Sequence, residues 1–124
     1  MIFLTVEDII VLHKKLIQVT GGLDGLRDKG LLESAVNSAF ASFDDVERYP
    51  SIEEKAARYA FSITNNHAFV DGNKRIGVFV MLMTLSLNDV EIHYTQPELI
   101  KLGLVIADGS VGYDYILRWI YEHR

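Results

Sequence analysis

The chain has 124 residues, of which 49% are hydrophobic and 23% charged, with a formal net charge of −5 at pH 7. These values predict one globular domain spanning residues 1–124. The acidic charge argues against binding of bulk nucleic acid, and the absence of cysteine excludes disulfides and thiolate metal sites. The longest uncharged stretch, Ile76 to Asn88, is too short to cross a bilayer, and the N-terminus has no signal-peptide pattern. We therefore expect a cytoplasmic protein.

Helical spacing dominates the first forty residues. Thr5 is a predicted N-cap, and the helix that follows it stops at Gly21-Gly22. Gly22 to Gly30 is an expected loop, and Asp28 within it can cap a helix from about Leu31 to Phe40. The apolar faces of these two helices comprise Val6, Ile9, Ile10, His13, Leu16 and Ile17, and then Leu31, Leu32, Ala35, Val36, Ala39 and Phe40.

The helical period breaks between Phe43 and Pro50. This segment mixes bulky and acidic residues and ends at a proline, which predicts an exposed connecting loop or short hairpin. Ser51 and Glu54 then match a capping box, so a helix begins there and ends near Asn66.

The segment from about Gly72 to Leu87 is hydrophobic all round, which predicts a central buried helix. Its β-branched residues would also allow a strand, but its length favours a helix. Val90 to Tyr94 alternates and is an expected short extended piece. Further helices are predicted from Thr95 to Ala107 and from Ser110 onward, the last with Tyr113, Ile116, Leu117, Ile120 and Tyr121 on its inner face. The sum is an all-α bundle of about six helices with a short flap or hairpin.

The residues that join the two central helices, His67 to Arg75, read His-Ala-Phe-Val-Asp-Gly-Asn-Lys-Arg. The first N–H groups of a helix lack partners and carry partial positive charge. Lys74 and Arg75 in the first turn are therefore unfavourable unless an anion binds. Gly72 allows a ligand to approach the backbone closely, so the pattern indicates a phosphate site.

Two other residues of this stretch suit phosphate chemistry. Asp71 is a hard oxygen donor for a Mg²⁺ ion that keeps waters and phosphate oxygens. His67, as a neutral imidazole, can take a proton from a hydroxyl nucleophile. Structural alternatives remain open, because Asp-Gly-Asn is a common turn, a single histidine is often structural and two cations can simply be solvated. Phe69 is an expected core anchor.

The remaining candidates are weaker. His13 lies on an apolar helix face and is expected in the core or at its boundary. His93 and His123 have no partner at metal-ligand spacing, so the sequence does not indicate a zinc site. Trp119 is expected to serve packing.

His67 to Arg75 resembles the Fic motif, His-x-Phe-x-(Asp/Glu)-(Gly/Ala)-Asn-(Gly/Lys)-Arg, and Gly21 to Ala35 resembles an N-terminal signature of the Doc branch. The resemblance covers essentially the whole chain and implies the all-helical Fic fold. Most Fic proteins transfer AMP from ATP to a target hydroxyl. Lys74 stands where those enzymes usually have glycine, and Val78 stands where they have a second arginine. Both departures match the Doc branch, in which the terminal phosphate is transferred.

The resemblance therefore implies a toxin that uses ATP and Mg²⁺ to phosphorylate a Ser/Thr hydroxyl of elongation factor Tu and arrests translation. Its implied partner is a small antitoxin whose disordered tail folds onto the toxin. AMP transfer is the alternative within the family. A catalytically dead binding module and a metal-dependent nuclease are alternatives from other classes.

The resemblance also implies roles for individual residues. His67 is the implied general base, and Asp71 is the implied Mg²⁺ ligand. Phe43 to Pro50 matches the family's flap, which docks the target as an added strand. Asn65 stands where the Doc branch often has a phosphate-binding arginine. The other implied roles are phosphate binding by Asn73, Lys74 and the Gly72 backbone, charge stabilisation or loop anchoring by Arg75, and target docking by Phe43, Val46 and Tyr49.

Overall fold

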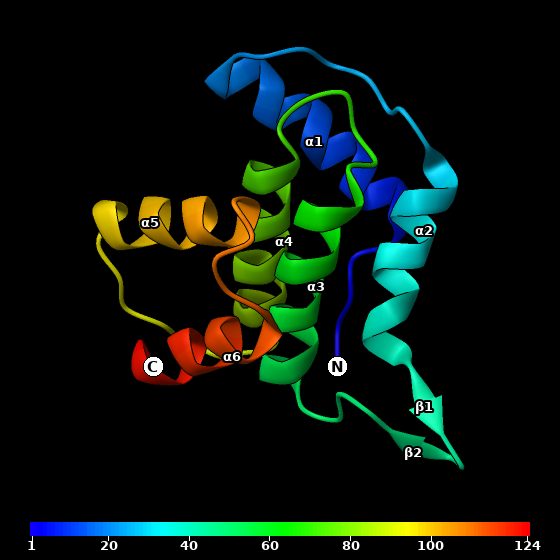
Figure 1. Ribbon diagram of the computed structural model, residues 1–124, viewed down its shortest axis with the longest axis vertical. Coiled ribbons are helices and arrows are strands. Elements are labelled where there is room, and N and C mark those ends of the chain that lie inside the picture. Colours follow the sequence, from blue (N-terminus) through cyan, green and yellow to red (C-terminus); the bar gives the residue numbers. More distant parts are fainter.

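The computed structural model describes residues 1–124 as six α-helices and one short hairpin (Figure 1), which confirms the predicted all-α fold. None of the helices is both long enough and apolar enough to cross a membrane. The elements are α1 (Val6–Thr20), α2 (Lys29–Asn37), the 3₁₀ turn η1 (Ser38–Phe40), β1 (Ser42–Phe43), β2 (Val46–Glu47), α3 (Ile52–Asn66), α4 (Asn73–Leu87), α5 (Gln96–Ala107) and α6 (Tyr113–Glu122).

Side-chain caps explain where four of the helices begin. Thr5, Ser51 and Thr95 form capping boxes with the acidic residue three positions later, and the Asp28 carboxylate accepts the Leu31 N–H. Such a cap contributes about 1 kcal/mol to helix stability. By contrast, the N-cap residue of α4 is Gly72, and no side chain caps the N-terminus of this helix.

The helices α3 and α4 run side by side through the centre of the molecule (Figure 1). One buried cluster lies between them and α1 and α2, and a second lies between them and α5 and α6. Gly77 permits the close approach of α3 and α4, because a Cβ atom there would lie 2.4 Å from Thr64 Oγ1 and 3.1 Å from the Ala60 carbonyl oxygen. The absence of a side chain at position 77 therefore sets how closely the two central helices cross.

Val90 to Tyr94 belongs to no helix or strand, and its extended form stays a prediction. Two expectations for the last helix were wrong. The last helix begins at Tyr113 rather than Ser110, because the Ser110 N–H donates to the Asp108 carboxylate (2.7 Å) and holds a turn. On this helix Tyr121 is exposed, while Trp119 is buried as expected.

The segment between Phe43 and Pro50 contains the hairpin, which was one of the two predicted forms, the other being a connecting loop. Phe43 and Val46 are 84% and 68% exposed, in agreement with the expected exposure. Tyr49 is only 4% exposed, so the expected exposure was wrong at this position. Its ring packs against Tyr113 at a centroid distance of 5.0 Å, and its carbonyl accepts a hydrogen bond from the buried Lys55 ammonium.

Candidate active site

The loop from His67 to Gly72 connects α3 to α4 at the end of the molecule where α1 lies (Figure 1). His67 ends α3 in the left-handed conformation (φ 52°), and Gly72 precedes α4 in the same region (φ 78°). Asn73 closes the loop, because its Oδ1 accepts the Phe69 N–H and its Nδ2 donates to the Phe69 carbonyl, both at 3.0 Å. The Asn73 amide is thus engaged with the loop backbone.

A second loop, Gly22 to Asp28, is hydrogen-bonded along the first. The N–H groups of Arg27 and Asp28 donate to the Ala68 carbonyl, and the Val70 N–H donates to the Gly25 carbonyl. The Arg27 guanidinium also donates to the His67 carbonyl, with an Nε–O distance of 2.9 Å. These contacts hold the backbone of His67 while its side chain stays exposed.

Backbone donors hold the Asp71 carboxylate. Its Oδ2 accepts the Leu23 N–H at 3.1 Å, and its Oδ1 accepts the Gly72 N–H at 2.8 Å. These two bonds, together with the nearby Arg75 guanidinium, lower the pKa of Asp71 below its ordinary value. The carboxylate therefore stays ionised to lower pH than an ordinary aspartate.

The two cations of the motif have different surroundings. Arg75 Nη1 donates to Thr20 Oγ1 (2.6 Å) and to the Gly21 carbonyl (2.8 Å), and its Nη2 lies 3.6 Å from Asp71 Oδ1. Lys74 forms no ion pair within the chain, although the neighbouring α4 N-terminus is positive. Lys74 is therefore the free cation of the site, whereas Arg75 anchors the loop to α1.

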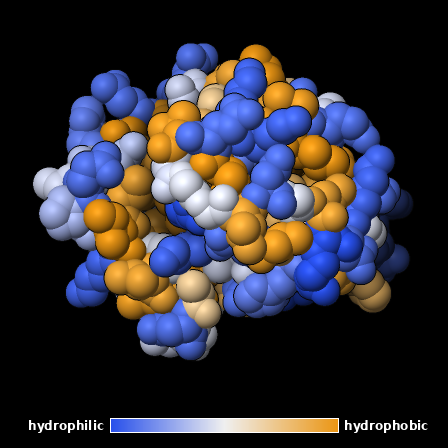
Figure 2. Space-filling view, turned by 90° about the horizontal axis from the view of Figure 1, so that it is seen from above, coloured by the Kyte–Doolittle hydropathy of each residue, from blue (hydrophilic) through white to orange (hydrophobic).

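These residues surround a pocket of about 290 Å³. Figure 2, which views the molecule from the end that carries the motif loop, shows a hollow with hydrophilic atoms at its floor. The pocket is lined by Thr64, His67, Val70, Asp71, Gly72, Asn73, Lys74, Arg75 and Ala107. The structure thus brings together the motif residues with predicted roles in catalysis or phosphate binding, and it places an imidazole, a carboxylate and a free ammonium group in one cavity.

The hairpin residues do not join this pocket. The hairpin precedes α3 and the motif follows it, so the two lie at opposite ends of α3 (Figure 1). A helix of 15 residues is about 22 Å long at 1.5 Å per residue. A target chain in contact with both Phe43 and His67 would have to span about seven extended residues. The docking role of Phe43, Val46 and Tyr49 stays a prediction, and the burial of Tyr49 leaves its ring unavailable.

The model of the Fic/DOC family matches residues 3–85, which is more than half of the chain. The chain belongs to the Fic/DOC family. Toxin Doc of Mycolicibacterium smegmatis is 40% identical over 72 residues, which cover 58% of this chain and 55% of that relative. Protein kinase doc of Escherichia phage P1 is 31% identical over 106 residues, which cover 86% of this chain and 82% of that relative. The chain thus matches about half the length of the first relative and most of the second.

Sequence reasoning missed the residues that support the Fic/DOC motif from outside. Leu23 binds the Asp71 carboxylate, Thr20 binds Arg75, and Arg27 binds the His67 carbonyl. The adjacent glycines at positions 21 and 22 were the feature of the sequence that could have indicated this supporting loop. A Cβ atom on Gly22 would lie 2.6 Å from Asp71 Oδ2, so this glycine is part of the site and not only a helix stop.

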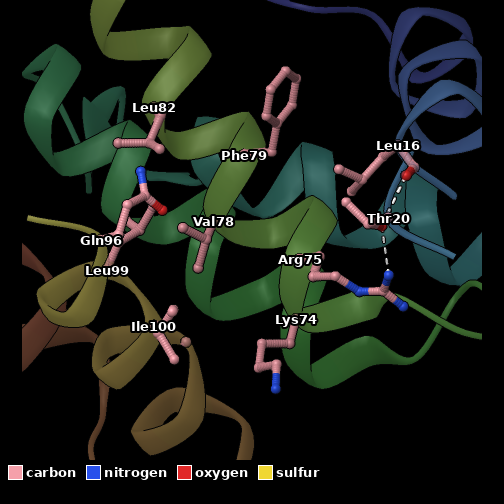
Figure 3. Close-up of a pocket in the computed structure, with 11 residues that line it drawn as sticks. Leu16, Thr20, Lys74, Arg75, Val78, Phe79, Leu82, Gln96, Leu99 and Ile100 are labelled. Carbon is pink, nitrogen blue, oxygen red and sulfur yellow. Dashed lines mark hydrogen bonds between the residues drawn. The ribbon is translucent and has the colours of Figure 1, made fainter.

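A second cavity, of about 490 Å³, opens beside Lys74 and Arg75 between α1, α4 and α5 (Figure 3). The expectation that α4 is covered all round was wrong on this face, where Phe79 and Leu82 are only partly buried. Val78 lies one turn beyond Lys74 and lines the same apolar groove. The groove is lined by Leu16, Thr20, Lys74, Arg75, Val78, Phe79, Leu82, Gln96, Leu99, Ile100 and Gly103.

Proposed function

We propose that this Fic/DOC protein is a Doc-type toxin that transfers the γ-phosphate of ATP to a Ser/Thr hydroxyl of elongation factor Tu. The observation that carries the proposal is the free ammonium of Lys74 at the uncapped N-terminus of α4, in one pocket with His67 and Asp71. The name Protein kinase doc of the phage relative, which matches most of the chain, agrees with phosphate transfer.

The roles of the residues follow from their surroundings. His67 would accept the proton of the target hydroxyl as its oxygen forms a bond to the γ-phosphorus, and the bond to the ADP oxygen would break. Lys74 and the first-turn N–H groups of α4 would bind phosphate oxygens. Arg75 would fix the loop through Thr20 and Gly21, and Asn73 would fix it through Phe69.

The Asp71 carboxylate suits a Mg²⁺ ion. No group of three or more histidine, cysteine or acidic side chains is arranged to hold a metal ion, so Asp71 would supply one ligand and water and phosphate oxygens would supply the others. When bound, Mg²⁺ would neutralise charge on the phosphate oxygens. The Leu23 and Gly72 N–H groups use one lone pair of each carboxylate oxygen and leave the others for the metal.

Val78 supports transfer of the γ-phosphate rather than of AMP. Its buried isopropyl group lies in the apolar groove one helical turn beyond Lys74, where a second arginine would otherwise reach phosphates. Phosphate binding is therefore concentrated at Lys74 and the helix N-terminus.

The test is incubation with elongation factor Tu and ATP labelled at either the α- or the γ-phosphate. We expect label from the γ position only, and none with His67→Ala or Asp71→Asn. Lys74→Met should reduce transfer at least tenfold, whereas the control Lys101→Met, an exposed lysine of α5, should not. Label from the α position would establish AMP transfer instead. Growth arrest by His67→Ala equal to that of the wild type would mean that toxicity does not depend on catalysis.

We also propose that an antitoxin segment binds the groove between α1, α4 and α5. An amphipathic helix suits an apolar groove of this kind, and the groove ends at Lys74 and Arg75, so an occupant would reach the active site. Leu82→Asp and Ile100→Asp should prevent co-purification with a co-expressed antitoxin. Val11→Asp, an exposed apolar residue outside the groove, is the matched control. Co-purification that survives both groove substitutions would place the antitoxin elsewhere.

A further inference from the structure

We propose that His13 of α1 is a positioning residue for the transfer reaction, which it serves by holding the backbone of Asp71. This inference rests on the proposed function, in which Asp71 binds the metal. His13 is 58 positions away from Asp71 in the sequence, and its imidazole is 1% exposed. It does not line the pocket that contains His67 and therefore cannot itself reach the reacting atoms.

The imidazole lies directly beneath the motif loop. Its Nε2 is 2.7 Å from the Asp71 carbonyl oxygen. Its plane stacks on the Phe69 ring with a centroid distance of 3.8 Å and an interplanar angle of 14°. A Cβ atom on Gly72 would be only 3.4 Å from the same Nε2. One side chain of α1 thus contacts the loop at Phe69 and Asp71 and lies beside Gly72.

The hydrogen bond has a defined direction. A carbonyl oxygen only accepts, so Nε2 must carry a proton and donate it to Asp71. The other ring nitrogen, Nδ1, lies 3.8 Å from the Asp24 carboxylate, which belongs to the second loop. His13 therefore binds the motif loop and lies close to the second loop.

Holding the Asp71 carbonyl also holds the carboxylate. The Asp71 carbonyl and the Gly72 N–H belong to the same rigid peptide plane. The Gly72 N–H donates to Asp71 Oδ1, and the Leu23 N–H donates to Oδ2. If the peptide rotates, the Gly72 donor turns away and the carboxylate loses one of its two backbone bonds. Residues that orient a metal ligand in this way typically contribute 10- to 100-fold to affinity or activity.

Three substitutions separate the hydrogen bond from the packing. His13→Phe keeps a stacked ring without a donor. His13→Gln loses the ring but can place an amide N–H near the position of Nε2, and His13→Asn is too short to do so. We expect His13→Phe and His13→Asn to lower kcat for γ-phosphate transfer by about 10- to 100-fold with little change in the KM for the protein target. His13→Gln should recover most of this loss.

Amide hydrogen exchange gives a second readout that needs no nucleotide. The N–H groups of Gly72 and Leu23 should exchange faster in His13→Phe and His13→Asn than in the wild type and His13→Gln. Activity that follows thermal stability across the series, or unchanged exchange in His13→Asn, would overturn the positioning role. If the wild type transfers no phosphate at all, the proposed function fails, and the exchange rates still decide whether His13 holds the loop. If His13→Phe does not fold, the comparison of His13→Asn with His13→Gln still tests the positioning role.

Discussion

At the scale of single residues, the site depends on two adjacent glycines. Gly21 and Gly22 both have positive φ angles, 84° and 110°, and both precede the contact of Leu23 with Asp71. A Cβ atom on Gly21 would meet nothing within 4 Å. A Cβ atom on Gly22 would meet Asp71 Oδ2 at 2.6 Å and Arg75 Nη2 at 3.0 Å. A substitution at either glycine strains the backbone, but only a substitution at Gly22 would also displace the Asp71 carboxylate.

Gly22→Ala should abolish most of the phosphate transfer, because the new methyl group must push the Asp71 carboxylate out of place. Gly21→Ala is the matched control, since it introduces backbone strain while its methyl group meets no atom within 4 Å and its carbonyl can still accept from Arg75. Both substitutions should lower the free energy of unfolding by about 1–3 kcal/mol. Denaturant unfolding and γ-phosphate transfer, measured on both variants, check this prediction. Equal loss of activity in the two variants would contradict it.

At the scale of elements, α5 and α6 are linked by one hydrogen-bonded pair. His123 Nε2 lies 2.8 Å from the Glu98 carboxylate, and His123 Nδ1 lies 2.7 Å from the Trp119 carbonyl oxygen. Both partners only accept, so the imidazole must be doubly protonated to make both bonds. The link matters for the site because α5 forms one wall of the groove, where Gly103 packs on the Lys74 stem.

The link should make stability depend on pH in a defined direction. Burial by itself would lower the pKa of His123, but the bonds to Glu98 and Trp119 outweigh it and raise this pKa. The His123 hydrogen bond and then the Thr95 bonds lower the pKa of Glu98 to about 2. The stabilisation is therefore full between the ordinary pKa values of 4.5 and 6.5. It is lost as pH rises through the raised His123 pKa or falls toward 2.

Thermal unfolding followed from about pH 6 to about pH 9 checks this prediction. The wild type should lose stability with rising pH more steeply than His123→Phe, which keeps a ring against Trp119. Glu98→Gln should flatten the curve as well. This substitution keeps the helix cap, since glutamine still completes the capping box at Thr95. Curves for the three proteins that run parallel over this range would show that the pair does not titrate as stated.

At the scale of the whole molecule, α3 and α4 belong to both buried clusters. The α3 alanines and Val78 and Met81 of α4 pack toward α5 and α6. Tyr59 and Ile63 of α3 and Ile76 and Val80 of α4 pack toward α1 and α2. The crossing of α3 and α4 thus sets the spacing of the two halves. It also sets the separation between the end of α3, which carries His67, and the start of α4, which carries Lys74.

Gly77→Ala should destabilise the fold even though alanine favours a helix by about 1 kcal/mol. Its Cβ atom would overlap Thr64 Oγ1 and press on the α3 backbone, and such overpacking costs about 1–3 kcal/mol or more. Gly103→Ala on α5 is the control, because its Cβ atom would meet the flexible Lys74 stem at 3.2 Å and Val78 Cγ2 at an ordinary contact distance of 3.8 Å. Denaturant unfolding should show a lower midpoint for Gly77→Ala alone. A midpoint for Gly77→Ala at or above the wild type would contradict the close crossing.

Local rules were enough for most of the elements. The caps at Thr5, Asp28, Ser51 and Thr95 lie where the sequence predicts them, because each cap binds the N–H of the residue three positions later. Prediction failed where a longer-range or competing bond intervened. Tyr49 lies in a segment that looks exposed, but contact with Tyr113 buries it.

The sequence by itself determined the helices, the all-α class and the residues of the motif, because these follow from periods and spacings within a few residues. Tertiary structure alone decided how the motif is held. His13, Thr20 and Leu23 come from parts of the chain 48 to 58 positions away from their partners in the motif. It also decided that one face of α4 stays uncovered and forms the groove beside Lys74. These features arise from the packing of distant segments, and no local pattern encodes which distant backbone group will meet a given side chain.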